Sequence, residues 1–200
     1  MPNLLVATHN AHKTGEFRAM LSDFFDDVAD LTTLLDMEEP EENGSTFAEN
    51  SAIKALAASN ALPDAFVIAD DSGLEVDALN GAPGIYSARY SGANATDATN
   101  RDKLIEELGK PEHEGKERSA RFRCVITVAR GGEVLAVFDG AVEGRIAHSM
   151  TGEGGFGYDP LFIPEGCEDS FGVLPEEVKN DMSHRGQALE KFRAWLSEQS

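Results

Sequence analysis

Apolar residues follow two different spacings along this chain, and together they predict alternating strands and helices. Short continuous apolar runs at residues 4–7 and 66–69 are typical of buried strands. Elsewhere in the first half, apolar positions recur every three or four residues, which predicts helices over residues 13–25, from 46 onward and over 96–108. The second of these helices begins at the sequence T-F-A-E, which has the pattern of a capping box.

At the start of the second half of the chain, the spacing of apolar residues changes. Within residues 119–130 an alternation sets Phe122, Cys124, Ile126 and Val128 against Arg121, Arg123 and Thr127, which predicts a long strand. Gly131-Gly132 then indicates a hairpin turn. The pattern further predicts strands at residues 74–79, 134–138, 142–147 and 161–163, and two helical pieces after Pro175, the second over 186–198. Helices and strands intermixed in this way predict an α/β fold with a mixed sheet.

Length and composition restrict the classes of protein that the chain can belong to. Two hundred residues suit one domain spanning residues 1–200, with room for two lobes. The net charge of −19 argues against a broad surface for DNA or RNA. No apolar stretch reaches the length of a membrane span and no signal peptide is visible, and two cysteines make no disulfide framework. We therefore expect a reduced, cytoplasmic protein with neither a nucleic acid polymer nor a membrane as partner.

The polar segment after the first strand has the composition of an anion site. Thr8, Asn10 and Lys13 supply a hydroxyl, an amide and an ammonium group at the predicted start of a helix, and all three suit phosphate oxygens. The glycine-rich patterns G-x-x-x-x-G-K-[ST] and G-x-G-x-x-G are both absent. The alternative interpretation is that Thr8 and Asn10 are ordinary helix caps and Lys13 is a solvated charge.

Acidic residues gather at a second place. Asp70 and Asp71 end the run F-V-I-A-D, and Glu42 lies in an acidic loop at residues 36–45. Carboxylates at the end of a strand suit Mg²⁺, which prefers oxygen ligands and keeps several waters, and one of them could act as a general base. The alternative interpretation is a turn, D-D-S-G, in which the aspartates cap backbone N–H groups.

Two further segments carry candidate binding groups. In G-G-F-G-Y-D-P, glycines flank Phe156 closely, as if its ring must face something flat, and aromatic rings stack on nucleobases. Near the C-terminus, Lys179, His184 and Arg185 concentrate positive charge in an acidic chain. Taken singly, the first segment is also compatible with a glycine-rich turn whose aromatic side chains are core anchors, and the second with a solvated basic surface.

In combination these segments resemble one family from end to end. The segments T-H-N-A-H-K at 8–13, E-N-G-S-T-F-A-E-N-S-A-I-K-A at 42–55, A-D-D-S-G-L-E-V-D-A-L-N-G-A-P-G-I-Y-S-A-R-Y-S-G at 69–92, G-G-F-G-Y-D-P-L-F at 154–162 and S-H-R-G-Q-A-L at 183–189 occur in the family's order. The chain is similar to the inosine triphosphate pyrophosphatase family, the Ham1-like enzymes that remove non-standard purine nucleotides.

The resemblance implies a fold and a reaction. The implied fold is a long mixed β-sheet flanked by helices, with two lobes around a central cleft. The implied reaction is the hydrolysis of ITP, dITP or XTP to the monophosphate and pyrophosphate. The resemblance also implies Mg²⁺ as the cofactor and a homodimer as the oligomeric state. Two alternatives remain: a pyrophosphatase for other modified or pyrimidine nucleotides, and a nucleotide-binding module without catalysis.

The resemblance also assigns roles to residues. Glu42 and Asp71 match the magnesium ligands, and Asp71 also matches the catalytic carboxylate. The remaining residues match substrate contacts: Thr8, His9, Asn10, Ala11, His12, Lys13, Lys54, Ser72, Phe156, Gly157, Tyr158, Asp159, Lys179, His184 and Arg185. Because Arg185 is a permanent donor, we expect it to favour the 6-oxygen of hypoxanthine over the amino group of adenine. We expect Asp70, as a turn residue, to tolerate substitution better than Asp71.

Overall fold

The chain forms two compact units in a computed structural model that describes residues 4–33, 37 and 40–199. Unit 1 comprises Met1–Asp71, Cys124–Gly140 and Arg185–Ser200, and unit 2 comprises Ser72–Arg123 and Ala141–His184. The chain therefore passes from one unit to the other four times, and neither unit is one continuous segment. Residues 36, 38 and 39 of the expected acidic loop lie outside the described residues.

The strands form a mixed sheet in the order β2-β1-β3-β4-β5-β6. β1 pairs in parallel with both β2 and β3, whereas β5 and β6 are antiparallel. Parallel neighbours need a crossover connection, and α1 and α2 provide the crossovers from β1 to β2 and from β2 to β3. The strands are β1 (Leu4–Val6), β2 (Val28–Asp30), β3 (Phe66–Val76), β4 (Ser119–Arg130), β5 (Glu133–Ile146) and β6 (Phe162–Pro164). The predicted fold class, a mixed sheet flanked by helices, is confirmed.

Local sequence signals account for where several helices begin. Thr46 caps α2 by accepting a hydrogen bond from the Glu49 N–H, as the capping pattern predicted. Thr96 and Thr99 form a reciprocal capping box at the start of α3. The helices are α1 (Ala11–Leu21), α2 (Phe47–Ala61), α3 (Asp97–Leu108), α4 (Glu176–Met182) and α5 (His184–Gln199).

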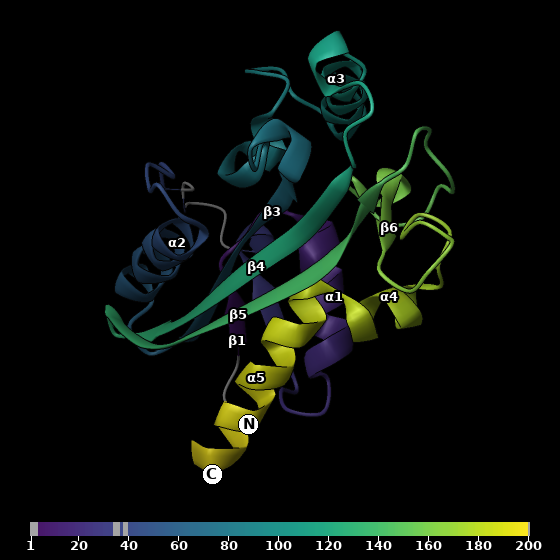
Figure 1. Ribbon diagram of the computed structural model, residues 1–200. Coiled ribbons are helices and arrows are strands. Elements are labelled where there is room, and N and C mark those ends of the chain that lie inside the picture. Colours follow the sequence, from purple (N-terminus) through teal and green to yellow (C-terminus); the bar gives the residue numbers. More distant parts are fainter. Residues whose placement is uncertain (1–3, 34–36, 38–39, 200) are drawn as a thin grey trace. The chain divides into compact units, whose positions relative to one another are not determined.

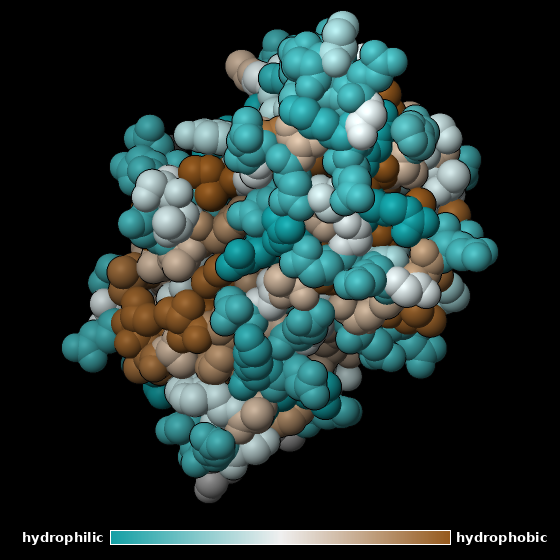
Figure 2. Space-filling view, in the orientation of Figure 1, coloured by the Kyte–Doolittle hydropathy of each residue, from teal (hydrophilic) through white to brown (hydrophobic). Residues whose placement is uncertain are grey.

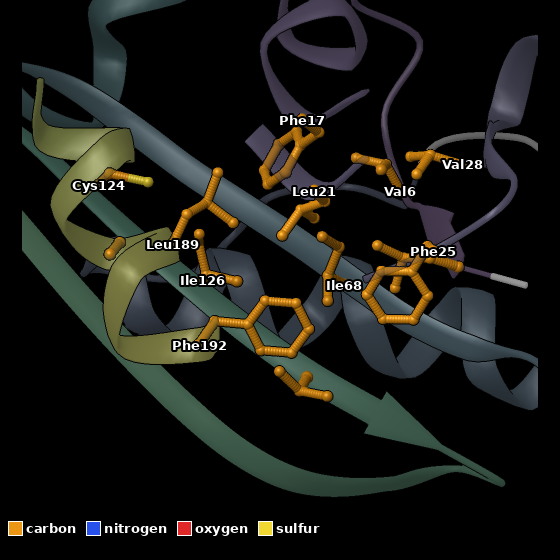
Figure 3. Close-up of a cluster of buried hydrophobic side chains, with 13 residues drawn as sticks. Val6, Phe17, Leu21, Phe25, Val28, Ile68, Cys124, Ile126, Leu189 and Phe192 are labelled. Carbon is orange, nitrogen blue, oxygen red and sulfur yellow. The ribbon is translucent and has the colours of Figure 1, made fainter. Parts of the chain in front are cut away.

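In unit 1, helices cover both faces of the sheet, and the alternation of strand residues decides which face each side chain joins (Figure 1). On one face, α1 and α5 pack their apolar side chains against every second strand residue (Figure 3). On the other face, the small residues Ala55 and Ala58 let α2 approach the strands closely. The first cluster is Leu4, Val6, Phe17, Leu21, Phe25, Val28, Ile68, Cys124, Ile126, Val128, Ala188, Leu189 and Phe192, and the second is Leu5, Ala7, Leu31, Ala55, Ala58, Val67, Ala69 and Ala129.

Unit 2 has its own core, which is rich in aromatic side chains. Phe122 on β4 lies against Phe162 at a ring distance of 4.7 Å, and Phe171 packs 5.4 Å from Phe162. Leu104 and Leu108, one turn apart on α3, complete one side of this cluster. Tyr158 also belongs to this cluster, so the glycine-rich loop at residues 152–158 ends in the core of unit 2.

The structure differs from the sequence prediction mainly in how strands continue. β3 runs without a break from Phe66 to Val76, so the interpretation of D-D-S-G as a turn is wrong, and Asp77–Leu79 is a 3-10 turn instead. β5 is likewise one strand over Glu133–Ile146 instead of two. β2 was not predicted, and α1 ends at Leu21 instead of near residue 25. The hairpin at Gly131-Gly132 is confirmed, with φ of 60° and 79°, as a tight turn requires.

The first part of β5 presents apolar side chains to solvent. Val134, Leu135 and Val137 are 42%, 44% and 51% exposed, and Figure 2 shows hydrophobic surface near the end of the β4–β5 hairpin. Among the described residues, β6 pairs only with the Gly144–Ile146 end of this strand. The Glu133–Gly140 part of β5 therefore forms a sheet edge in unit 1.

Within the described part of the chain, no helix is long and apolar enough to cross a membrane.

Candidate active site

The loop after β1 forms the cap of α1. The Asn10 side chain accepts hydrogen bonds from the N–H groups of His12 and Lys13, and the Thr8 hydroxyl accepts one from the Asn10 N–H. The capping interpretation is thus confirmed for Asn10, with Thr8 bonded to its backbone, whereas Lys13 is half-buried and paired with Asp70 and is not a solvated charge. His9, Asn10, Ala11 and His12 are exposed, so the positive end of the helix dipole remains open to an anion.

A buried charge network connects this loop to the centre of the sheet in unit 1. Lys13 Nζ lies 3.0 Å from Asp70 Oδ1, and Arg185 Nη2 donates to Asp70 Oδ2 at 2.7 Å. The second amino group of Arg185 donates to Glu16, one turn after Lys13 on α1. Arg185 and Asp70 are each only 1% exposed. Asp70 is therefore the centre of a buried ion network, a role that the sequence interpretation missed.

This network decides the protonation state of Asp70. Burial alone would raise the pKa of the carboxyl, but Lys13 and Arg185 outweigh it and hold the pKa well below its usual range. The thiol of Cys124 lies 3.9 Å from the same carboxylate, and burial together with the Asp70 charge raises the pKa of the thiol. Asp70 is thus a fixed negative charge, and Cys124 is an inert, protonated core residue.

A second charge cluster of unit 1 surrounds Lys54, which α2 contributes. Its Nζ lies 2.8 Å from Glu42 Oε1 and 3.4 Å from Asp71 Oδ1. Burial would lower the pKa of Lys54, but Asp71, Asp70 and Glu42 raise it, so the ammonium stays charged. A cation therefore lies between the two carboxylates that the resemblance assigns to a metal.

Asp71 differs from its neighbour in its electrostatic setting. Burial raises the pKa of Asp71, and the nearby charges of Glu42 and Asp70 add to that effect against the opposing pull of Lys54. Its buried Oδ2 has no hydrogen-bond partner among the described residues. A carboxylate with an unsatisfied buried oxygen and a raised pKa is suited to bind a cation or to accept a proton.

In unit 2, the glycine-rich loop holds an aromatic ring beside a cation. Lys179 Nζ lies 4.8 Å from the centroid of the Phe156 ring and 2.7 Å from Asp159 Oδ2. The same carboxylate oxygen accepts the Phe156 N–H at 2.8 Å. Asp159 and Lys179 are buried, whereas Phe156 is half-buried. Phe156, Asp159 and Lys179 therefore form one connected group, and their contact with a substrate stays a prediction.

The other expected site residues of unit 2 lie as follows. The buried Tyr158 packs into the core and donates its hydroxyl hydrogen bond to the Ser87 carbonyl at 2.8 Å. His184 stacks on Phe122, with ring centres 4.8 Å apart and planes 13° apart. Ser72 is half-buried on β3, directly after Asp71. The core interpretation is thus confirmed for Tyr158, and the substrate contacts of these residues stay a prediction.

Sequence reasoning missed several residues that organise these groups. Glu16 was unmarked, although it follows Lys13 by one helical turn and could be expected on the same face of α1. Asp97 and Arg101 on α3 bond to the backbone of Gly157, and their spacing of four residues was the signal available. Each of these side chains contacts an expected site residue but lies outside the motif segments, so the motifs alone could not reveal it.

The motif segments all lie within a region of the chain that matches one family of known proteins. A sequence profile of the Ham1 family matches residues 4–195. The chain belongs to the Ham1 family. The predicted family is thereby confirmed.

Relatives match this Ham1-family chain over nearly its whole length. A protein from Desulfotalea psychrophila named dITP/XTP pyrophosphatase is 45% identical over 194 residues, covering 97% of this chain and 85% of the relative. One of the same name from Bacillus subtilis is 44% identical over 196 residues, 98% of both chains. The solved structures of Ham1 proteins from Staphylococcus aureus and Coxiella burnetii match with TM-scores of 0.86 and 0.87, at 41% and 39% identity. Each comparison covers 99% of this chain and 100% of the other.

Proposed function

We propose that this Ham1-family chain hydrolyses non-standard purine nucleoside triphosphates, namely dITP, XTP and ITP, to the monophosphate and pyrophosphate. The observation that supports this proposal most strongly is the charge cluster of unit 1, in which Lys54, Asp70 and Asp71 are buried and Lys13 and Glu42 are half-buried. It places two cations and an unsatisfied carboxylate beside an exposed helix N-terminus. Full-length relatives that are named dITP/XTP pyrophosphatase support the substrate class.

In this proposal the side chains of Lys13 and Lys54 bind the triphosphate. A triphosphate carries about four negative charges and would be repelled by a chain of net charge −19 unless local cations reverse the field. Lys13 and Lys54 provide those cations, and the residues of the first loop add polar groups at the end of α1. Lys13 is held by Asp70, so its ammonium is positioned before substrate arrives.

Asp71 is our candidate for the general base. A base works best when its pKa lies near the working pH, and burial raises the pKa of Asp71 in that direction. We propose that its carboxylate orients a water molecule and accepts its proton while the water oxygen attacks the α-phosphorus. The bond from the α-phosphorus to the bridging oxygen then breaks, and pyrophosphate leaves. Ser72, next along β3, is proposed to contact the substrate.

The residues present fit a magnesium ion. The unsatisfied Oδ2 of Asp71 and the carboxylate of Glu42 are oxygen donors, and Lys54 already holds a positive charge between the two residues. The described residues contain no group of three or more His, Cys, Asp or Glu side chains able to hold a metal. That is compatible with Mg²⁺, which commonly uses one or two carboxylates together with waters and substrate phosphates. When bound, the ion would supply charge neutralisation at the phosphates.

We propose that the glycine-rich loop and the basic residues Lys179, His184 and Arg185 bind the base and sugar. The Phe156 ring offers a stacking surface, since aromatic side chains stack on nucleobases without regard to sequence. Gly157, Tyr158 and Asp159 belong to the same loop, and Lys179 lies against the ring. His184 and Arg185 are kept as proposed substrate contacts. For Arg185 the two carboxylates that hold its guanidinium add a second, structural role.

The reaction is tested by a pyrophosphate-release assay on dITP, XTP, ITP, the standard nucleotides and modified pyrimidine nucleotides, with Mg²⁺ and with EDTA. We expect release from the first three substrates, a monophosphate as the second product, and loss of turnover with EDTA. Orthophosphate with a diphosphate would contradict the reaction. Preference for a pyrimidine nucleotide would contradict the substrate class, and binding without release would indicate a binding module.

We further propose that the protein is a cytoplasmic homodimer and that the Glu133–Gly140 edge of β5 contributes to its interface. An uncovered strand edge with exposed apolar side chains is a template for pairing with another strand. The exposed Val134, Leu135 and Val137 carry no charge, so an interface centred on these three side chains would bury apolar surface. Light scattering should give twice the chain mass for the wild type and a smaller mass for Val137→Glu. An unchanged mass in the variant would exclude this edge.

A further inference from the structure

Gly157 directly follows Phe156, and one helix bonds both polar groups of its backbone. Asp97 Oδ2 accepts the Gly157 N–H at 2.7 Å, and Arg101 Nη1 donates to the Gly157 carbonyl at 2.6 Å. Asp97 and Arg101 are four residues apart at the start of α3, so their side chains lie on the same face of the helix. The first turns of α3 thus hold a single loop residue by both its donor and its acceptor.

The first turn of α3 is itself firmly anchored within unit 2. The capping box of Thr96 and Thr99 closes the end of the helix. Asn100, 3% exposed, accepts the Ser91 N–H at 2.8 Å and donates to the Ala88 carbonyl at 3.1 Å. The side chains that hold Gly157 therefore project from a rigid support.

Gly157 needs such a support because a glycine is the most flexible point of a loop. Its φ is +60°, and an added Cβ would meet no atom within 4 Å, so the residue is required for its backbone conformation and not for lack of space. On either side the chain is already fixed, at Phe156 by the Asp159 carboxylate and at Tyr158 by its bond to Ser87. The bonds from α3 fix the one residue in between.

We infer that Asp97 and Arg101 are positioning residues for the aromatic ring that stacks on the base. They act through the Gly157 peptide and do not need to touch the substrate. By holding the loop in one conformation before a ligand arrives, they lower the entropy lost when the base stacks on Phe156. This inference rests on the proposed function, because it assumes that Phe156 is the stacking surface.

Paired substitutions separate this role from a general effect on the helix. Asp97→Ala and Asp97→Asn both remove a charge from the first turn of α3, so the change in the helix dipole is the same. Only the asparagine retains an oxygen that can accept the Gly157 N–H. Arg101→Met removes the donor and keeps an apolar stem, whereas Arg101→Lys keeps a donor. Glu106→Gln, exposed on the same helix, is the control for a change of surface charge.

The test compares a ligand that carries a base with one that does not. Calorimetry gives the Kd of inosine monophosphate and of inorganic tripolyphosphate for each variant, and steady-state kinetics with dITP give kcat and KM. We expect Asp97→Ala and Arg101→Met to weaken monophosphate binding and raise KM by about tenfold, as for one lost hydrogen bond of about 1.4 kcal/mol. We expect kcat and the Kd of tripolyphosphate to stay at the wild-type level, and Asp97→Asn, Arg101→Lys and Glu106→Gln to bind both ligands nearly as the wild type does.

Three results would overturn the inference. One is an unchanged Kd of inosine monophosphate in both Asp97→Ala and Arg101→Met. Another is equal weakening in Asp97→Asn and Asp97→Ala, which would assign the effect to charge. A third is a parallel loss of tripolyphosphate binding, which would indicate general damage to the fold. A wild type that binds dITP without releasing pyrophosphate would contradict the proposed reaction but would leave this comparison of binding constants intact.

Discussion

Substituting Asp70 by asparagine removes one charge from the centre of a buried network and changes almost nothing in shape. The carboxylate forms an ion pair at each oxygen: Lys13 Nζ lies 3.0 Å from Oδ1, and Arg185 Nη2 lies 2.7 Å from Oδ2. Asparagine has one accepting oxygen, so its NH₂ group must face one of the two cations. Two donors then oppose each other in a site that solvent hardly reaches, since Asp70 is 1% exposed.

The expected cost follows from what remains after the substitution. Removing one partner of a buried ion pair typically costs about 3–5 kcal/mol, because the other charge is left without compensation. Arg185 keeps Glu16 and asparagine keeps one hydrogen bond, so we expect the lower end, about 3 kcal/mol. For a chain of this size each kcal/mol lowers Tm by about 2–4 °C, which predicts a fall of about 6–12 °C.

The dependence on pH identifies the charge as the cause. The folded chain holds the pKa of Asp70 well below the value of about 3.9 that an unfolded aspartate has. Its contribution to stability is therefore fully present above about pH 4 and is lost as the pH falls toward the folded pKa. The difference in stability between the wild type and Asp70→Asn should be constant near neutral pH and should narrow below about pH 4.

The assay is urea denaturation at several pH values, with Asp71→Asn as the matched control on the same strand. In the folded chain the pKa of Asp71 is raised, so folding disfavours its ionised form, and removing that charge should not lower the stability at neutral pH. Asp70→Asn should therefore be destabilised and Asp71→Asn should not. A free energy of unfolding of Asp70→Asn equal to that of the wild type at neutral pH, or a stability difference that does not change below pH 4, would refute this reasoning.

The remaining predictions concern activity. Asp71→Asn should fold but lose about 10²–10⁴-fold in kcat through loss of the general base, and near-normal turnover at saturating Mg²⁺ would exclude Asp71 as the catalytic carboxylate. Gly155→Ala should lower Tm and weaken nucleotide binding, because φ at this position is +71° and the new Cβ would lie 2.1 Å from Asp159 Oδ2. Gly157→Ala is the control: its φ of +60° gives the same backbone strain, but no atom lies within 4 Å of the new Cβ. Arg185→Ala should lose more activity on ITP than on ATP if Arg185 reads the 6-oxygen; an equal loss on both, together with a lower Tm, would leave it only its structural role.

Some features of the structure follow from signals within a few residues. Thr46 caps α2, Gly131-Gly132 turns the chain between β4 and β5, and the alternation in the first half of β4 matches its alternately buried and half-buried residues. Each depends on hydrogen bonds or side-chain direction within one element. The motif order also sufficed to predict the family, since the segments that resemble it span the chain and the Ham1 profile matches residues 4–195.

The buried polar residues, in contrast, could not be interpreted from local sequence signals. D-D-S-G has the composition of a turn, yet β3 continues through it, because Asp70 meets cations from other elements and needs no turn to satisfy it. Arg185 has the composition of a surface cation and lies fully buried. Their partners are remote in sequence: Arg185 is 115 residues from Asp70 and 169 from Glu16.

The sequence by itself therefore determined most of the helices and strands, the fold class and the family, because helix and strand periodicity and capping are local and leave a regular pattern. Only the tertiary structure decided that Asp70 is a buried, permanently charged centre, that Asp71 beside it has a raised pKa, and that α3 holds the loop of Phe156. The physical reason is that the energy of a buried charge depends on which partners surround it in space. Those partners are brought together by the packing of distant segments, which no local pattern records.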